Sequence, residues 1–448
     1  MSAVTRMDPE RTAIQDGPAE DEFLKLDDLV TVRKETARRS LDRSVAELEI
    51  LIREKKWLDV IALFHPVEEK APELVEHGLQ NRVKEKLAFA FGQLGRFDEA
   101  IAELAACIEA DPDNFYLRNS MAYTAYNSLY AAKNRETFLS GKSRVERVHL
   151  AHRHFTAAQR LRPDGVTNFY RQGMLYKQLE GKTAKALPLF EKAIRNWENL
   201  EPAGRDAHHQ ERKNYIKALF NGASAALDIG KVQAALGMME KCVAEDEKTE
   251  YISLVFKYFG LGKVYYQTGS YQEARDALLF AARCRTSLPA DFVSELLART
   301  YLMLDNSEKA GDVIARIPAK RKTPYICWTE ADILVSLGDY AGARRVLGKS
   351  KERDSRSKHK TLIRLAKLEY ALGHFDLTRK FAREAAGFYE KRWGNLFADG
   401  LFWHALGAYR LGFTDEARKL VHELGEVFQD YPNLAQLRRK LGQLGSLE

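Results

Sequence analysis

The feature that most constrains this chain of 448 residues is an internal repeat. The segments GRFDEAIAELAACIEADPDN, starting at Gly95, and GSYQEARDALLFAARC, starting at Gly269, place a glycine, an aromatic residue, a small residue and a leucine at the same spacing. A repeated unit of this length buries its apolar face only by stacking against its neighbours. We therefore expect a linear array of similar units.

One small or β-branched residue after each turn serves as a register mark for the repeat. The marks are Val60, Ala100, Ala151, Ala186, Ala235, Ala274, Ala310, Ala343, Thr378 and Ala417. They are separated by about 40 residues on average, a length typical of two-helix repeats. Two longer intervals predict polar insertions near residues 133–145 and 196–211.

Each unit has the pattern of two helices joined by a turn. Apolar residues recur at helical spacing on both sides of Gly269, and no segment alternates as a strand would. Seven of the ten turns carry glycine five residues before the mark, where a left-handed backbone ends a helix at low cost. These glycines are Gly95, Gly181, Gly230, Gly269, Gly338, Gly373 and Gly412. The pattern predicts an all-α fold.

The repeat resembles the tetratricopeptide repeat (TPR) family. The residues that match its motif are Leu261, Gly262, Tyr265, Gly269, Tyr271, Ala274 and Ala281 in one unit, and Gly173, Tyr176, Gly181, Ala186, Phe190 and Ala193 in another. The resemblance covers roughly residues 41–430 and implies a right-handed α-solenoid of about ten helical hairpins. Two units depart from the motif, because the one around Val60 lacks both the glycine and the alanine, and the one around Ala310 has Asp305 in place of glycine.

The array leaves a segment at each end. We expect a disordered acidic segment at residues 1–22, the repeat solenoid at 23–432, and a capping helix at 433–448 that covers the open end.

Several classes of protein are disfavoured by composition. No apolar run approaches the ~18 residues of a membrane span, and the polar N-terminal stretch has no secretory signal. The four cysteines lie far apart, with neither disulfide-framework nor zinc-site spacing. We therefore expect a protein of the reducing cytoplasm that does not insert into membranes.

No group of residues has the spacing of a catalytic site. Gly260-Leu261-Gly262-Lys263 only superficially resembles a phosphate loop, and helix packing explains Gly262 better. His149, His152 and His154, with Glu146, are interpreted as a solvated basic face. Cys107 and Cys242 occupy small-residue core positions. The chain is predicted to be no enzyme and to need no cofactor or metal.

The resemblance to the TPR family implies that the first helices of the units line a concave face that binds protein segments. Amide and phenol groups on such a face can hydrogen-bond an extended peptide, although several of the tyrosines would equally pack between units. The candidate protein-binding residues are Tyr116, Asn119, Tyr123, Tyr126, Asn127, Tyr170, Lys177, Gln178, Lys263, Tyr266, Gln267 and Arg299.

A second candidate surface is basic. The net charge is +7, and residues 313–360 hold much of the excess. This favours an acidic partner, although surplus lysine and arginine more often only solvate helices. Acidic residues interrupt the stretch and stacking aromatics are absent from its basic run, which argues against nucleic acid.

Together these observations predict a non-catalytic scaffold or adaptor that binds protein or peptide segments and helps to assemble a complex. Two alternatives remain open: a nucleic-acid-associated regulator that uses residues 313–360, and an accessory subunit of a separate enzyme. A stand-alone enzyme is disfavoured because no convergent cluster of titratable residues is evident.

Overall fold

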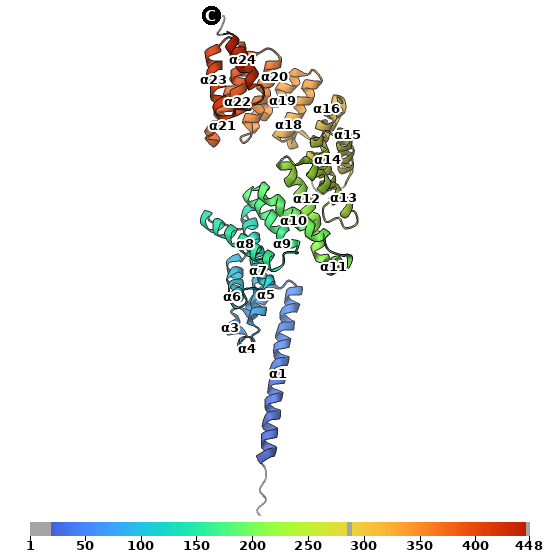
Figure 1. Cartoon of the computed structure of the whole chain (residues 1–448), viewed down its shortest axis with the longest axis vertical. Coiled ribbons are helices and arrows are strands. Elements are labelled where there is room, and N and C mark those ends of the chain that lie inside the picture. Colours follow the sequence, from blue (N-terminus) through green and yellow to red (C-terminus); the bar gives the residue numbers. More distant parts are fainter. Residues whose placement is uncertain (1–18, 285–288, 445–448) are drawn as a thin grey trace, which may run out of the picture. The chain divides into compact units, whose positions relative to one another are not determined.

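The computed structural model describes residues 19–284 and 289–444, and all regular structure in these ranges is helical (Figure 1). The chain divides into two compact units, residues 1–215 and 216–448, and the boundary falls within α12 (Arg212–Asp228). The all-α fold predicted from the repeat is confirmed.

The first unit is made of helices joined by short turns. They are α1 (Ala19–Arg53), α2 (Trp57–Phe64), α3 (Val67–Lys70), α4 (Pro72–Glu76), α5 (Gln80–Gln93), α6 (Phe97–Ala110), α7 (Phe115–Lys133), α8 (Gly141–Leu161), α9 (Thr167–Met174), the π-helical η1 (Leu175–Glu180), α10 (Thr183–Glu198), α11 (Pro202–Ala207) and the 3₁₀ turn η2 (His209–Glu211).

The second unit continues the same alternation after α12. Its helices are α13 (Val232–Glu245), α14 (Leu254–Thr268), α15 (Tyr271–Arg283), α16 (Asp291–Met303), α17 (Ser307–Ala315), the 3₁₀ turn η3 (Ala319–Arg321), α18 (Pro324–Ser336), α19 (Tyr340–Arg353), α20 (Lys358–Ala371), α21 (Phe375–Trp393), α22 (Ala398–Arg410), α23 (Thr414–Val427) and α24 (Leu434–Leu444).

The ten register marks lie on ten second helices, namely α2, α6, α8, α10, α13, α15, α17, α19, α21 and α23. Each of the ten side chains has an exposed fraction of 0%. A small residue at this position lets the second helix approach the first closely, and larger apolar side chains fill the space beside it. The predicted register is therefore confirmed in every unit.

The turns show why most units have glycine. All seven turn glycines have φ between +70° and +83°. In the two divergent units Lys55 and Asp305 adopt the same left-handed conformation, with φ of 59° and 55°. In a third unit the second helix is extended, because α8 begins ten residues before Ala151, and the left-handed residue there is Arg135.

Replacing Asp305 by glycine should stabilise the second unit by about 0.5–1 kcal/mol, because glycine has no Cβ to clash in the left-handed conformation. Urea unfolding followed by circular dichroism measures the change. Asp305→Ala is the matched control and should not stabilise, since alanine keeps the Cβ. A glycine variant less stable than wild type would show that the aspartate side chain has a local role that outweighs the backbone cost.

Gly262 illustrates the other use of glycine in this fold. It lies inside α14, and a Cβ built there would lie 2.6 Å from Cγ of Leu278 on α15. Real Cβ atoms do not come so close to a carbon, so a larger residue fits only if the Leu278 side chain or the two helices shift. The interpretation of Gly260–Lys263 as helix packing, and not as a phosphate loop, is confirmed.

The insertions and the ends also contain helix. The first insertion extends α7 and α8 around a short loop, and the second contains α11 and η2. Asn196 and Trp197, at the start of the second, are buried at the end of α10. Of the segment 1–22, residues 1–18 lie outside the described residues, and residues 19–22 belong to α1.

The last helix, α24, covers the final hairpin. Its Leu434, Leu437 and Leu441 are buried in one cluster with residues of α22 and α23. None of the described helices is both long and apolar enough to cross a membrane.

Candidate protein-binding surface

Eight of the twelve predicted binding residues lie in the first unit, on α7, α9 and η1, and the other four lie in the second unit, on α14 and α16. All of these elements are first helices of their hairpins, as predicted.

In the first unit a stack of tyrosines runs along α7. The ring centroids of Tyr123 and Tyr126 are 6.3 Å apart, and those of Tyr126 and Tyr130 are 6.1 Å apart. The guanidinium of Arg171 on α9 lies 3.7 Å from the centre of the Tyr123 ring, which ties the first helices of two units together.

Two of these tyrosines are packing residues. Tyr170 is 9% exposed and contacts Phe190, and burial raises its pKa. Burial also raises the pKa of Tyr126 to about 12. Tyr116, by contrast, is 65% exposed at the start of α7.

The predicted amide residues differ in their surroundings. Asn119 is half-buried, and its Oδ1 is buried without a hydrogen-bond partner among the described residues. Asn127 is half-buried as well. The backbone oxygen of Gln178, next to Lys177 in η1, accepts a hydrogen bond from Lys133 at 2.9 Å.

In the second unit the four predicted residues are not all in contact. Tyr266 and Arg299 meet across α14 and α16: Arg299 donates to the Tyr266 hydroxyl at 3.3 Å, and its guanidinium lies 4.9 Å from the ring centre. Lys263 is half-buried, and Gln267 is exposed at the end of α14.

The prediction included Tyr266 and Arg299, but it missed three similar contacts between a cation and an aromatic ring in the second unit. Arg364 of α20 lies 4.6 Å from the ring centre of Trp328 on α18. Lys367 of α20 lies 5.6 Å from that of Trp403 on α22, and Arg410 of α22 lies 5.5 Å from that of Tyr370 on α20. Each pair joins the first helices of consecutive hairpins. We call the set Tyr266, Arg299, Trp328, Arg364, Lys367, Tyr370, Trp403 and Arg410 the cation–aromatic row.

The row lies on a continuous face, because α14 contacts α16, α16 contacts α18, α18 contacts α20 and α20 contacts α22. Lys367 and Arg410 are exposed, whereas Arg364 is half-buried. The Nε atom of Arg364 is buried and has no hydrogen-bond partner among the described residues. A buried donor of this kind favours an added acceptor.

Two carboxylates lie among these cations. Glu295 accepts a hydrogen bond from the Thr329 hydroxyl at 2.6 Å and lies 3.9 Å from Arg299. Burial raises the pKa of Glu295. Desolvation also raises the pKa of Asp332, and the positive charges of Arg364 and Arg299 oppose this rise only in part. Four cations therefore face two carboxylates, and the face is basic.

A simple extension of the sequence rule would have found part of the row. Lys263 and Arg299 each stand six residues before the turn residue, Gly269 or Asp305. The same offset from the next two turn glycines gives Asp332 and Lys367. Arg364 and Trp328 follow from no such rule, because their contact depends on how α18 and α20 are placed.

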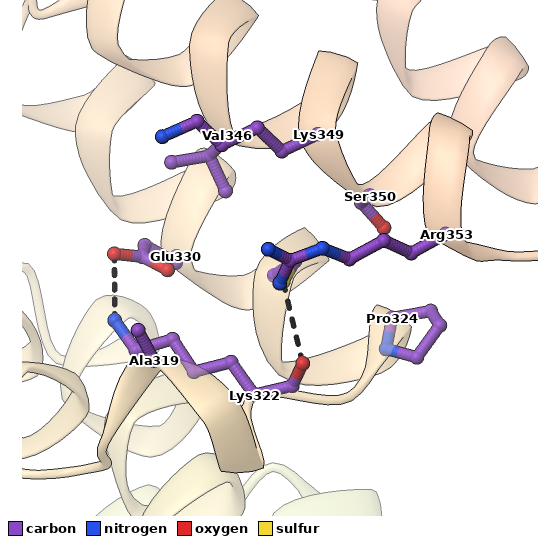
Figure 2. A pocket seen from close by; sticks show the side chains of 9 residues that line it. Ala319, Lys322, Pro324, Glu330, Val346, Lys349, Ser350 and Arg353 are labelled. Atoms are coloured by element: carbon purple, nitrogen blue, oxygen red, sulfur yellow. Dashed lines mark hydrogen bonds and ion pairs between the residues drawn. The ribbon is translucent and has the colours of Figure 1, made fainter.

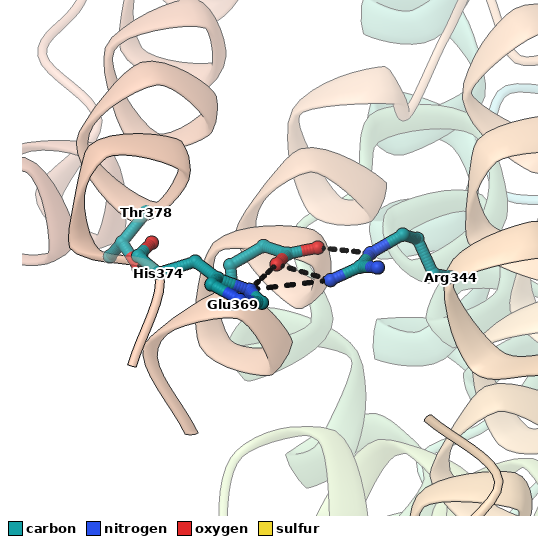
Figure 3. A network of polar contacts seen from close by, with 4 residues as sticks. All are labelled: Arg344, Glu369, His374 and Thr378. Atoms are coloured by element: carbon teal, nitrogen blue, oxygen red, sulfur yellow. Dashed lines mark hydrogen bonds and ion pairs between the residues drawn. The ribbon is translucent and has the colours of Figure 1, made fainter. Parts of the chain in front are cut away.

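Part of the basic stretch 313–360 is engaged within the fold. Arg344 binds the buried carboxylate of Glu369 through Nε and Nη2, each 2.6 Å from an oxygen (Figure 3). Lys358 pairs with Glu384 at 2.9 Å, and Lys351 lies 5.6 Å from the ring centre of Phe381. These charges are partly neutralised before any partner binds.

Within residues 19–284 and 289–444 no three His, Cys, Asp or Glu side chains are placed to hold a metal ion. Cys107 and Cys242 are fully buried, and burial raises the pKa of their thiols to about 11 and about 12, so they are small core residues as predicted.

The histidine group differs from its interpretation as a solvated face. His154 is 6% exposed, and burial lowers its pKa to about 4. His152 lies with Nε2 2.6 Å from Glu180 and Nδ1 3.2 Å from Gln172. Only His149 is exposed. The polar partners on η1 and α9 could not be read from the spacing of the histidines themselves.

Comparisons with known proteins agree with the repeat. Family models described as tetratricopeptide repeat match residues 82–114 and residues 168–199. These ranges contain α5 with α6 and α9 with α10. Both matches support a role in protein interaction. No curated protein matches the chain.

Many solved structures match the chain, and the identity and coverage of three of them are as follows. A tetratricopeptide repeat protein from Parabacteroides merdae is 17% identical, with a TM-score of 0.42, over 65% of this chain and 99% of that one. Yeast Tom70 is 12% identical, with a TM-score of 0.40, over 90% and 95%. YrrB, described as a TPR protein with an unusual peptide-binding site, is 15% identical, with a TM-score of 0.35, over 52% and 96%.

The family assignment depends on the two repeat matches and on the ten hairpins, whose register marks are all buried. On this evidence the chain contains tetratricopeptide repeats.

Proposed function

We propose that the chain is a non-catalytic adaptor that binds an acidic, extended segment of a partner protein along the cation–aromatic row of its second unit. The observation that carries this proposal is the row itself, in which the first helices of consecutive hairpins hold cations against aromatic rings. An adaptor of this kind would bring its partner into a larger assembly, and no reaction on the partner is required.

Stacking on a ring prepares each cation for a ligand. A guanidinium held over an aromatic face loses little further side-chain freedom when it binds, and its N–H edge stays available to a carboxylate. No carboxylate lies within 4.0 Å of Arg364, Lys367 or Arg410 among the described residues, so these charges are open to an external partner. Charge-assisted hydrogen bonds to arginine are among the stronger polar contacts in proteins.

The face also fits an extended chain. The rings of Trp328, Tyr370 and Trp403 are half-buried and offer apolar surface between the charges. A segment that alternates acidic and apolar side chains would place carboxylates on the cations and apolar groups on the rings.

The proposal can be tested with a fluorescent peptide that alternates glutamate and leucine, and with the same peptide carrying glutamine. The double variant Arg364→Met, Lys367→Met should weaken binding of the acidic peptide at least about tenfold, as expected for the loss of two charged contacts. Fluorescence anisotropy measures the dissociation constants.

The matched control is Arg345→Met with Lys380→Met, which removes two exposed charges from the second helices α19 and α21. This control should leave binding within about twofold of wild type if local contacts outweigh the long-range field. Equal loss in both double variants, or equal affinity for the glutamine peptide, would contradict a specific acidic site. Thermal melting of all proteins checks that folding is preserved.

The predicted residues of the first unit remain a proposed second contact surface. Tyr116, Tyr123, Asn119, Asn127, Lys177 and Gln178 would extend binding to another part of the partner. Gln267 and Lys263 would extend the row at its α14 end. The alternative of a nucleic-acid regulator is tested with single-stranded RNA at physiological salt, where we expect no binding.

A further inference from the structure

A pocket in the second unit is independent of the cation–aromatic row. It has a volume of about 190 Å³ and lies between η3, α18 and α19 (Figure 2). Its lining consists of Ala319, Lys322, Pro324, Cys327, Glu330, Val346, Lys349, Ser350 and Arg353.

Ser350 supplies the first indication of a ligand. Its side chain is 4% exposed, and its Oγ is buried without a hydrogen-bond partner among the described residues. A hydroxyl left unpaired in this way has a desolvation cost that a bound acceptor would remove. The pocket that Ser350 lines therefore favours a group with acceptor oxygens.

Charge supplies the second indication. Lys322 is already bound to Glu330, with Nζ 2.7 Å from Oε1. Lys349 and Arg353, both exposed, have no carboxylate within 4.0 Å in the part of the chain that the structure describes. In Figure 2 the Arg353 side chain extends from α19 toward Glu330. Three cations against one carboxylate leave an excess of two positive charges at the pocket.

We propose that this pocket binds a phosphomonoester group. A phosphomonoester carries close to two negative charges at neutral pH and three terminal acceptor oxygens. Arginine, lysine and a hydroxyl are the donors that most often bind such a group. The pocket is small for a whole cofactor, so the ligand is a small free phosphomonoester or the phosphorylated side chain of a peptide.

The pocket and the cation–aromatic row use different faces of α18. Cys327 and Glu330 line the pocket toward α19. Trp328 donates from Nε1 to Thr361 on α20, and Thr329 donates to Glu295 on α16. Ligands of the two sites would therefore not compete for the same side chains.

Cys327 provides a direct reporter of occupancy. Its thiol lines the pocket and is half-buried, whereas Cys284 is half-buried elsewhere and serves as an internal reference. Burial raises the pKa of both thiols, so alkylation is run at mildly alkaline pH and followed by peptide mass spectrometry. Phenyl phosphate should slow alkylation of Cys327 in a saturable manner and leave Cys284 unaffected.

The ligand series separates the two sources of the phosphate. Protection by phenyl phosphate assigns a free phosphomonoester, and protection only by a phosphoserine peptide assigns a phosphorylated side chain. Equal protection by benzoate, or no protection by either phosphate, would overturn the proposal.

Variants test which residues bind the phosphate. Lys349→Met with Arg353→Met should raise the half-protecting concentration at least about tenfold, and Ser350→Ala should raise it severalfold. Arg345→Met, an exposed arginine of α19 outside the lining, is the control and should not change it. If the double variant kept the wild-type protection curve, the cations would not form the site. The acidic-peptide assay on the row uses other residues, so either site can fail without the other.

Discussion

Replacing Arg344 by methionine should lower the free energy of unfolding of the second unit by about 1–3 kcal/mol, because a buried carboxylate loses its partner although Arg344 itself is 45% exposed. The carboxylate of Glu369 has an exposed fraction of 0%, and Arg344 supplies two of the three hydrogen bonds that it accepts. The third comes from Nδ1 of His374 at 2.8 Å (Figure 3). Without Arg344 a buried negative charge would keep only one partner. Urea unfolding at pH 7 measures the loss, and hydrogen exchange of α20 and α21 locates it.

The pH dependence of this variant has a definite sign. Burial alone would raise the pKa of Glu369, but the hydrogen bonds from Arg344 and His374 outweigh it and hold the pKa below 4.5. The pair therefore stabilises the folded protein above pH 4.5, and this stabilisation is lost as the pH falls through the lowered pKa. The difference in stability between wild type and Arg344→Met should shrink below pH 4.5.

Glu369→Gln is the companion variant. It removes the charge and keeps the shape, so it should cost less than Arg344→Met because no carboxylate is left buried. A cost for Arg344→Met no larger than that of an exposed surface pair, about 0–1 kcal/mol, would show that His374 and solvent suffice for Glu369.

Replacing Asp246 by alanine should cost more, about 3–5 kcal/mol, because both partners of its ion pair are buried. Asp246 is fully buried and lies 3.1 Å from the ammonium of Lys257, whose side chain is 1% exposed. It also accepts hydrogen bonds from the backbone N–H groups of Tyr251 and Ile252 and from the Thr249 hydroxyl. The substitution would leave a buried cation without its carboxylate and two backbone donors unpaired.

The double variant Asp246→Ala, Lys257→Met distinguishes the charge from the loop. Removing the ammonium eliminates the uncompensated charge, so the double variant should be more stable than Asp246→Ala alone. Additive losses would mean that the cost lies in the turn at residues 249–252 and not in the pair. Both variants are compared by urea unfolding at one pH.

The repeat register could be predicted from sequence because it depends on local and periodic properties. Ala274 and Thr378 differ in chemistry but are both small enough for the close approach of two helices, and both are fully buried. The turn conformation also follows from position, since Asp305 adopts the left-handed backbone that glycine has elsewhere. The spacing rule did not place the left-handed turn residue in the unit where α8 is lengthened before Ala151.

The candidate site was predicted in part. The spacing rule correctly placed the candidates on first helices, and it found Tyr266 and Arg299, which meet. It did not show that Tyr170 is a packing residue or that Trp328 holds Arg364. These facts depend on which side chain of one helix reaches which side chain of the next.

By itself the sequence determined the helical hairpin, its register and its turns, because a helix and its apolar face are set by residues three and four positions apart. Tertiary structure alone decided which charges remain available. Arg344, Lys349 and Arg353 belong to one basic stretch, yet Arg344 is bound to Glu369 whereas Lys349 and Arg353 line a pocket. The partner of a side chain on the helix surface comes from another helix, many residues away, and its position follows only from the packing of the whole unit.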